Sequence, residues 1–372
     1  MKFIIRADAA IHIGSGHIMR CLTLAKALRD YSHTVKFICR EFQGNLISYI
    51  RSQDFEVFNI PHLNNSLTSV DEENTHSSWL EVSQEEDFDS CKTFLEKEKP
   101  DWIIVDHYAL SEEWEVLARD HTKNIAVIDD LADRNHDCDI LLDQNYGSLE
   151  SSYAELVPNE CKLLIGTQYA LLRPEFAKYR EISVARREKN SYTINQILVN
   201  LGGIDKDNHT LSVLNALNAC LQNECVKVVM GATAPHIEDI KLYAQEVGFK
   251  CEVLVGINNM AELMANSDLA IGAAGSTTWE RCALGLPTIL VVLAENQIAV
   301  AKALADDGAV FLADVNSSLS EDIKLFFSRV SNDTNFLASL SKKSRKICFG
   351  DGVNKVVQVL SSLSKQGGMI CL

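Results

Sequence analysis

The sequence contains no long hydrophobic run. Its best candidate, the segment 288–294, is far shorter than the ~18 residues that a membrane-spanning helix needs. The apolar run at 1–6 is too short for a secretory signal peptide, so we expect neither a membrane segment nor a leader. Paired cysteines are also missing, because the eleven cysteines are scattered with no Cys-x-x-Cys motif. This spacing argues against a disulfide framework or a zinc site and predicts reduced thiols in a cytoplasm.

Positive charge is scarce as well. Thirty-five Lys and Arg residues stand against fifty-one Asp and Glu residues, which gives a net charge of −16. Nucleic-acid and anionic-membrane partners need a basic face, so neither is expected. An anionic ligand would have to be held by backbone amides and helix N-termini.

The composition is otherwise that of a folded protein, with 47% hydrophobic and 23% charged residues over 372 positions. This length predicts two domains. Short β-branched runs alternate with amphipathic stretches, which is typical of parallel α/β units. We expect strands at 2–6, 34–39, 102–106, 125–129, 140–143, 196–201, 226–230, 251–255, 269–272 and 288–293. We expect helices at 18–29, 210–220, 237–246, 260–265 and 277–284.

These elements predict two Rossmann-like units in tandem. We divide the chain into an N-terminal domain, 1–180, and a C-terminal domain, 181–372, with the polar segment 180–192 as a hinge. The stretch 61–90 is rich in Asn, Ser, Asp and Glu and predicts a long surface excursion. The helical tail from 332 is assigned to the second domain, although it could pack on either. A ligand is expected where the carboxyl ends of the two sheets face each other.

A glycine-rich loop, Ile13-Gly14-Ser15-Gly16-His17, joins the first strand to the first helix. Glycine lets the backbone approach a ligand closely, and helix amides then point toward it. The third glycine of a dinucleotide fingerprint is replaced by Met19, and the second strand ends in Arg40 rather than an acid. NAD is therefore not expected.

His17 lies in the first turn of that helix, where the macrodipole disfavours a protonated imidazole. A neutral imidazole is the form that a general base needs, and a capping or packing histidine is the alternative. Asp8 is a candidate to orient a partner, or to form an ion pair with Arg6 or Arg20. Asp106, at a strand end, is a candidate to hold His17 or a sugar hydroxyl.

A second loop combines Gly275, Ser276 and Thr277 with Glu280 in the helix that follows. Small residues, two hydroxyls and helix amides are typical of a metal-free diphosphate site. Glu280 can accept hydrogen bonds from a ribose diol. The alternatives are an acid that complements the helix dipole, and hydroxyls that only cap the helix.

These motifs resemble two related families. The second loop, with the segments 255–261 and 285–287, resembles the lipid II glycosyltransferase that uses UDP-GlcNAc and has the GT-B fold. The first half resembles the pseudaminic-acid pathway hydrolases called PseG. The segments that carry this likeness are 6–8, 13–17, 20–22, 79–80 with Asp87, 106–108, 129–132, 142–145, 166–174 and 200–203. The resemblance covers about residues 1–312.

The resemblance implies a metal-free and cofactor-free hydrolase. Its substrate would be UDP-2,4-diacetamido-2,4,6-trideoxy-β-L-altropyranose, cleaved to UDP and the free sugar. The matching motifs place the catalytic base on His17 in the Gly14–Gly16 loop, and support for the water or sugar on Tyr108 and Asn296. They place the UDP and sugar contacts on Ile257, Gly275, Ser276, Thr277, Glu280 and Gln297, with Arg6, Asp8, Gly14 and Gly16 as further substrate-binding positions.

Two other functions stay open at this point. One is a UDP-sugar glycosyltransferase on the same fold, and the other is a nucleotide-sugar sensor without turnover. Asp137 and Asp139 fit an Asp-x-Asp metal motif, but a turn before a strand is the preferred interpretation. We expect no metal. The sugar stereoisomer and the oligomeric state are not readable from the sequence.

Overall fold

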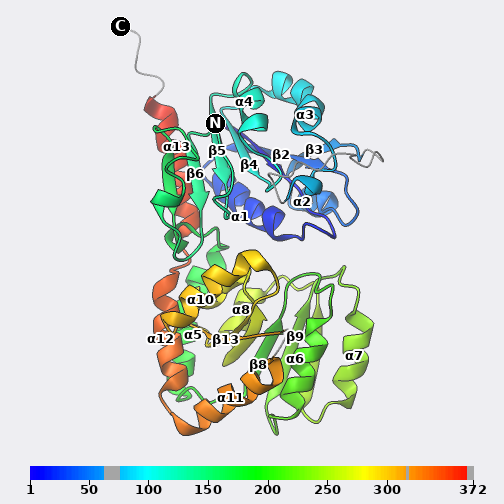
Figure 1. Ribbon diagram of the computed structural model, residues 1–372, viewed down its shortest axis with the longest axis vertical. Coiled ribbons are helices and arrows are strands. Elements are labelled where there is room, and N and C mark those ends of the chain that lie inside the picture. The colour runs from blue at the N-terminus through cyan, green and yellow to red at the C-terminus, as the bar shows by residue number, and fades with distance from the viewer. Residues whose placement is uncertain (63–75, 316–317, 367–372) are drawn as a thin grey trace. The chain divides into compact units, whose positions relative to one another are not determined.

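The computed structural model describes residues 1–62, 76–315 and 318–366, and the side chains of 364–366 are outside this description. The chain divides into two compact units. Unit 1 comprises Met1–Leu171 together with Gly352–Leu372, and unit 2 comprises Leu172–Asp351. Each unit is a parallel sheet with helices packed on it (Figure 1). The predicted α/β class with two Rossmann-like units is confirmed.

Unit 1 is built on a seven-stranded parallel sheet with the order β3-β2-β1-β4-β5-β6-β7. Its two central strands are mostly apolar and, apart from Lys2, buried, as is typical of parallel strands covered on both faces. The strands are β1 (Lys2–Ala7), β2 (Thr34–Arg40), β3 (Glu56–Ile60), β4 (Trp102–Asp106), β5 (Asn124–Ile128), β6 (Ile140–Asp143) and β7 (Lys162–Ile165). The order reverses between β1 and β4, so the ends of these two strands mark the switch point at which ligands of such sheets bind.

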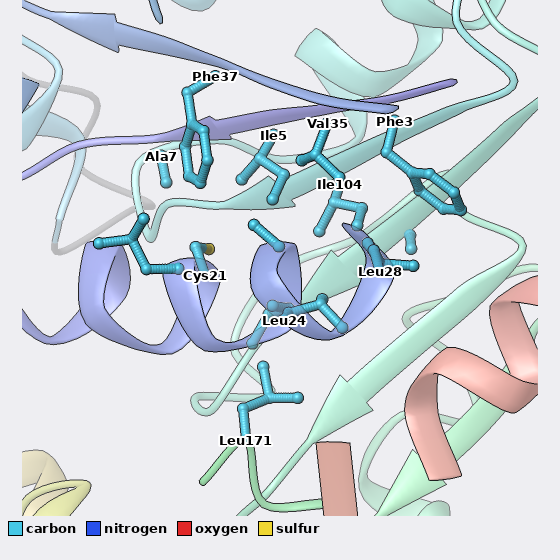
Figure 2. Close-up of a cluster of buried hydrophobic side chains, with 14 of the residues drawn as sticks. Phe3, Ile5, Ala7, Cys21, Leu24, Leu28, Val35, Phe37, Ile104 and Leu171 are labelled. Atoms are coloured by element: carbon cyan, nitrogen blue, oxygen red, sulfur yellow. The ribbon is translucent and has the colours of Figure 1, made fainter. Parts of the chain in front are cut away.

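Helix α1 (Gly16–Asp30) lies against this sheet and is buried on two sides. Figure 2 shows Cys21 turned toward the strands, near Ala7, and Leu24 turned toward Leu171. Unit 1 also contains the following helices: α2 (Ile47–Ser52), α3 (Gln84–Glu98), α4 (Glu112–Arg119), α13 (Gly352–Gln366) and the 3₁₀ turns η1 (Ser77–Trp79), η2 (Glu150–Ser152) and η3 (Thr167–Tyr169). Because α1 is buried, the position of its first turn, which contains Gly16 and His17, is fixed relative to the sheet of unit 1.

Helix α13 is the part of the predicted tail that belongs to unit 1, whereas α12 (Phe336–Ile347) belongs to unit 2, the second domain of the prediction. Val353, Val356, Val357 and Leu360 are all buried in the core cluster that contains Leu24 and Leu28 of α1. These four positions recur at helical spacing, so one apolar face of α13 covers α1. The hydrophobic contact, rather than chain order, decides where this helix packs.

Unit 2 has a six-stranded parallel sheet with the order β10-β9-β8-β11-β12-β13. Its strands are β8 (Gln196–Asn200), β9 (Cys225–Met230), β10 (Lys250–Val255), β11 (Leu269–Ala273), β12 (Thr288–Val291) and β13 (Phe311–Ala313). Its helices are α5 (Pro174–Lys189), α6 (His209–Asn218), α7 (Ile237–Glu246), α8 (Met260–Ala265), α9 (Thr277–Ala283), α10 (Ile298–Asp306), α11 (Leu319–Asn332), α12 (Phe336–Ile347) and the turn η4 (Glu295–Gln297). No helix in the described parts of either unit is long and apolar enough to cross a membrane.

The predicted hinge at 180–192 is wrong, because most of it belongs to helix α5. Proline begins this helix at its first position, which needs no backbone donor. The arginines that suggested an exposed linker donate to backbone carbonyls of unit 2. Arg180 donates to Ala283 O at 2.6 Å, and Arg187 donates to Ser267 O at 2.8 Å.

The stretch 61–90, predicted to be a long surface excursion, contains the first residues of a helix. Residues 63–75 lie outside the described residues, but α3 begins at Gln84. Ser83 and Glu86 form a capping box, which satisfies backbone donors at the helix start. The acidic residues of this stretch therefore start a helix, and one of them, Asp87, is fully buried.

Candidate active site

The first glycine loop turns tightly between β1 and α1. Gly14 has a φ of +86°, and its N–H donates to Ala10 O at 2.8 Å. Only glycine adopts this left-handed conformation without strain. A Cβ added at Gly14 or Gly16 would meet no described atom within 4 Å, so the backbone here is open to a ligand.

His17 follows in the first turn of α1, and its side chain is held by Asp106. The distance from His17 Nδ1 to Asp106 Oδ1 is 2.6 Å. Asp106 is the last residue of β4 and pairs in register with Ala7 at the end of β1, so the parallel sheet brings the carboxylate to the loop. With Nδ1–H donated to Asp106, a neutral His17 presents Nε2 as a proton acceptor. This is the arrangement of an oriented general base.

Arg20 is on the same helix, one turn further on, and it fixes Asp106 from the other side. Its Nε donates to Asp106 Oδ2 and its Nη2 to Asp106 Oδ1, both at 2.7 Å. Burial alone would raise the pKa of Asp106, but the Arg20 guanidinium and His17 more than offset this. The pKa of Asp106 therefore lies well below its usual range. Asp106 is a permanent anion behind the imidazole.

Tyr108 closes the network. Its hydroxyl donates to Asp130 Oδ2 at 2.8 Å, and Asp130 also forms an ion pair with Arg20. The Tyr108 ring meets the His17 ring edge to face, with 4.6 Å between centroids. Trp79 stacks on Tyr108 at 5.6 Å and lies 6.2 Å from His17. The two predicted catalytic residues of unit 1 are thus adjacent, in an aromatic setting that suits a sugar.

Arg6 and Asp8 have no exposed surface in the structure. Arg6 Nη2 lies 2.8 Å from Asp8 Oδ2 and 2.9 Å from Asp87 Oδ1. Asp8 Oδ1 accepts the backbone N–H of Arg40 at 2.7 Å. The ion pair, one of the two interpretations of Asp8, is what the structure shows. We therefore assign both residues to supporting the end of β1 rather than to touching a substrate.

The second loop connects β11 to α9 in unit 2. Ser276 is exposed at the N-cap position but makes no capping hydrogen bond with its side chain. The Thr277 hydroxyl accepts a hydrogen bond from Arg281 Nη1 at 3.1 Å. A Cβ at Gly275 would meet no described atom within 4 Å. The loop therefore offers hydroxyls and open backbone on one side and a buried guanidinium on the other.

Glu280 and the loop that contains Ile257 are linked by Arg173. Arg173 Nη2 lies 3.7 Å from Glu280 Oε1, and its Nη1 donates to Asn258 O at 3.4 Å. Burial raises the pKa of Glu280, and Arg173 opposes this shift only in part. Gly256, with a φ of +62°, makes the turn that presents Ile257. Two residues predicted to contact uridine thus lie around one arginine that the sequence argument did not single out.

Asn296 and Gln297 lie in η4, after β12. Strands β11 and β12 pair in parallel, so the loop that contains Asn296 and Gln297 and the loop that contains Gly275 both follow the carboxyl ends of neighbouring strands. Gln297 Oε1 accepts the backbone N–H of Leu293 at 3.0 Å, whereas Asn296 is exposed. The structure thus places His17 and Tyr108 in unit 1 and the predicted nucleotide contacts in unit 2.

The Asp-x-Asp motif is occupied by an arginine. Arg119 Nε lies 2.9 Å from Asp137 Oδ2, and its Nη1 lies 2.6 Å from Asp139 Oδ2. Asp139 also accepts the backbone N–H of Ile125 at 2.7 Å, which fixes the entry into β6. Both carboxylates therefore have a structural role before the strand.

The two Rossmann-like units give the chain a fold of the GT-B type. Residues 202–356 match the glycosyltransferase family 28 C-terminal domain. Over 97% of this chain and 99% of the other, the fold is that of MurG from Acinetobacter baumannii, with a TM-score of 0.67 and 16% identity. UDP-GlcNAc 2-epimerase from Neisseria meningitidis shares it at a TM-score of 0.61 and 11% identity, over 97% of this chain and all of that one.

Among curated proteins, the chain is similar to UDP-2,4-diacetamido-2,4,6-trideoxy-β-L-altropyranose hydrolase of Campylobacter jejuni. The two are 28% identical over 310 residues, which cover 83% of this chain and 97% of the relative. The chain is also 25% identical to the spore coat polysaccharide biosynthesis protein SpsG of Bacillus subtilis, over 97% of this chain and 98% of that one. The predicted resemblance to the hydrolase is confirmed at the level of sequence.

Proposed function

We propose that this protein is a UDP-sugar hydrolase. It cleaves UDP-2,4-diacetamido-2,4,6-trideoxy-β-L-altropyranose to UDP and free 2,4-diacetamido-2,4,6-trideoxy-L-altrose, a step of pseudaminic acid biosynthesis. The observation that carries the proposal is the pair of His17 and Asp106, 2.6 Å apart, at the end of an open glycine loop. Similarity to the Campylobacter hydrolase over most of both chains supports this substrate class.

The chemistry is a direct displacement at the anomeric carbon. A water oxygen attacks C1, the bond from C1 to the UDP oxygen breaks, and the electron pair leaves with UDP. His17 Nε2 takes a proton from the water, and Asp106 stabilises the resulting imidazolium. Tyr108 and Asn296 are proposed to position the water or the sugar. A single displacement inverts the configuration at C1.

The nucleotide is proposed to bind to unit 2. Ile257 contacts the uracil, Glu280 accepts the ribose hydroxyls, and Gly275, Ser276 and Thr277 hold the diphosphate, with Gln297 near the sugar. These groups suit a departing diphosphate, and we propose that neither a metal nor another cofactor takes part. We also propose a cytoplasmic location and no nucleic-acid partner, on the sequence arguments of scattered thiols and a net charge of −16.

Hydrolysis in ¹⁸O-labelled water tests the bond that breaks. Attack at C1 places the label on the free sugar, and early NMR spectra show the inverted anomer before mutarotation. Label in the β-phosphate of UDP would overturn this chemistry. His17→Asn is expected to lower kcat about 10²–10⁴-fold, the usual contribution of a general base, while calorimetry shows unchanged UDP affinity.

The family 28 domain favours one alternative, a glycosyltransferase. A transferase would release UDP rapidly only when an acceptor is added, whereas the hydrolase releases it with water alone. UDP release is therefore measured with and without candidate acceptors. Strict acceptor dependence would replace the hydrolase by the transferase, and UDP-sugar binding without turnover would indicate a sensor.

A further inference from the structure

Arg281 is a buried cation in unit 2 whose hydrogen bonds all go to neutral oxygens. Its side chain is 1% exposed. Nη2 donates to Ala273 O at 2.6 Å and to Thr278 Oγ1 at 3.0 Å, and Nη1 donates to Thr277 Oγ1 at 3.1 Å. Its Nε has no partner within the described residues. Burial lowers the pKa of Arg281 to about 10. The Glu280 carboxylate attracts this charge electrostatically, but no carboxylate within the described residues forms an ion pair or a hydrogen bond with it. A buried charge without a hydrogen-bonded counter-ion is unfavourable.

The fold makes room for this guanidinium with a glycine. Gly272 lies in β11, and a Cβ at this position would lie 2.2 Å from Arg281 Nη1 and 2.8 Å from Cζ. Any other residue at 272 would force the guanidinium away from Ala273 and the two threonines. The cation is therefore built into the turn between β11 and α9.

The bond to Thr277 determines which way that hydroxyl can donate. Thr277 Oγ1 accepts from Arg281, so its own proton must point elsewhere. Thr278 differs, because its hydroxyl already donates to Ala273 O at 3.4 Å. Thr277 is half-buried and lies next to the exposed Ser276 and the open backbone of Gly275. One side of the Thr277 hydroxyl thus meets the buried cation, and the other is left to donate toward the loop.

We propose that Arg281 is a positioning residue for a nucleoside diphosphate, and that the diphosphate adds negative charge near the guanidinium to that of Glu280. The guanidinium orients the Thr277 hydroxyl, and that hydroxyl donates to a phosphate oxygen. This inference rests on the proposed nucleotide site and deepens it. It adds a positive charge to a loop for which the sequence predicted only small residues, hydroxyls and helix amides. Because the charge belongs to the protein, the diphosphate requires less help from a bound cation.

Arg187 provides the matched control. It is also fully buried, and burial likewise lowers its pKa to about 10. Its guanidinium donates to Ser267 O at 2.8 Å and to two further neutral oxygens, Leu284 O and Ser183 Oγ. A buried arginine is therefore not by itself a ligand site. Arg281 differs because one of its bonds ends on a partly exposed hydroxyl in an open loop.

The test compares UDP with uridine, which lacks the phosphates, by calorimetry on the full-length protein. Arg281→Met and Thr277→Val are each expected to weaken UDP binding about 10- to 100-fold, the range of one hydrogen bond to a charged group. Uridine affinity stays unchanged. Arg281→Lys recovers part of the loss. In the double variant the losses do not add, because both substitutions interrupt the same link.

Arg187→Met is expected to lower thermal stability as Arg281→Met does, but to leave the ratio of UDP to uridine affinity unchanged. The proposal is overturned if Arg281→Met or Thr277→Val binds UDP like the wild type, or if UDP and uridine affinities fall together. If Arg281→Met does not fold, the ratio of UDP to uridine affinity is measured for Thr277→Val and Arg281→Lys instead, and a wild-type ratio in Thr277→Val overturns the proposal. A wild-type protein that binds neither UDP nor uridine overturns the proposed function itself.

Discussion

Replacing Asp106 by Asn tests the pair that carries the proposed mechanism. Asp106 accepts three short hydrogen bonds from nitrogen atoms, one from His17 Nδ1 at 2.6 Å and two from Arg20 at 2.7 Å, besides one from Cys21 Sγ at 3.2 Å. An amide has one acceptor and one donor group, so it cannot satisfy all three. If its oxygen faces His17, its NH₂ faces Arg20 Nε, donor against donor. If it is turned around, the NH₂ donates to Nδ1 and moves the imidazole proton to Nε2, where the base must be free.

In either orientation the negative charge behind the imidazolium is lost. We expect Asp106→Asn to lower kcat about 10²–10⁴-fold, or about 3–5 kcal/mol of activation free energy. UDP release from the diacetamido sugar nucleotide measures the rate, and calorimetry with UDP measures binding to unit 2, which should be unchanged. A variant that retained kcat within about tenfold of the wild type would refute the role of the pair.

Glu115 and His136 offer a matched control in the same unit. Both are buried, and Glu115 Oε1 lies 2.8 Å from His136 Nδ1. Glu115→Gln therefore makes the same chemical change in another buried carboxylate–histidine pair and should leave kcat unchanged.

The pH dependence of stability is a further test of the Asp106 assignment. The pKa of Asp106 is lower in the folded protein than its ordinary value of 3.8. The ionised carboxylate therefore stabilises the folded state above pH 3.8, and this stabilisation is lost as the pH falls toward the folded-state pKa. The stability difference between Asp106→Asn and the wild type should shrink as the pH falls toward 3.

Three further outcomes are expected. Glu280→Ala should weaken UDP binding by about 1.5–3 kcal/mol, the scale of hydrogen bonds to a charged group, and unchanged calorimetry would remove Glu280 from the ribose site. Burial and the Asp130 carboxylate raise the pKa of Asp143 to about 7, so the folded state loses stability as the pH rises from the ordinary value of 3.8 to about 7. Asp143→Asn should therefore raise Tm more at pH 8 than at pH 5, and equal shifts would contradict the cause given. Leu360→Ala should destabilise unit 1 by about 2–5 kcal/mol, seen as earlier unfolding of that unit alone, and a shift confined to unit 2 would refute the packing of α13.

Periodicity predicted ten strands and five helices, but it named none of β3, β13, α2, α3, α4, α10 and α11. The bounds expected for β4, β6, α7 and α8 are those of the structure. The pattern missed β7, an edge strand in which only Leu164 is buried, whereas all four residues of the equally short β6 are buried. It also missed α5, because its arginines are used to satisfy carbonyls rather than to face water.

The residues of the candidate site were also predictable only in part from the sequence. The glycine loop and His17 are local features, so their spacing along the chain reveals them. The partnership of His17 with Asp106 depends on the pairing of β1 with β4, which spacing does not encode, although a strand-end acid was a candidate. Arg281 gave no signal, because its importance depends on Gly272 opposite it in the folded strand.

The return of α13 to the first unit has a consequence for biosynthesis. During translation residues 1–171 emerge first, yet the helix that covers α1 is made only after the whole of unit 2. At about 5–20 residues per second, this delay is on the order of tens of seconds. During this delay, the apolar face of α1 that contains Leu24 is not covered by α13. Residues 172–351 form one uninterrupted segment, so unit 2 can fold in the meantime. We expect the nascent first unit to need protection by a chaperone, and a premature stop codon at position 352 to yield a product that binds UDP but aggregates.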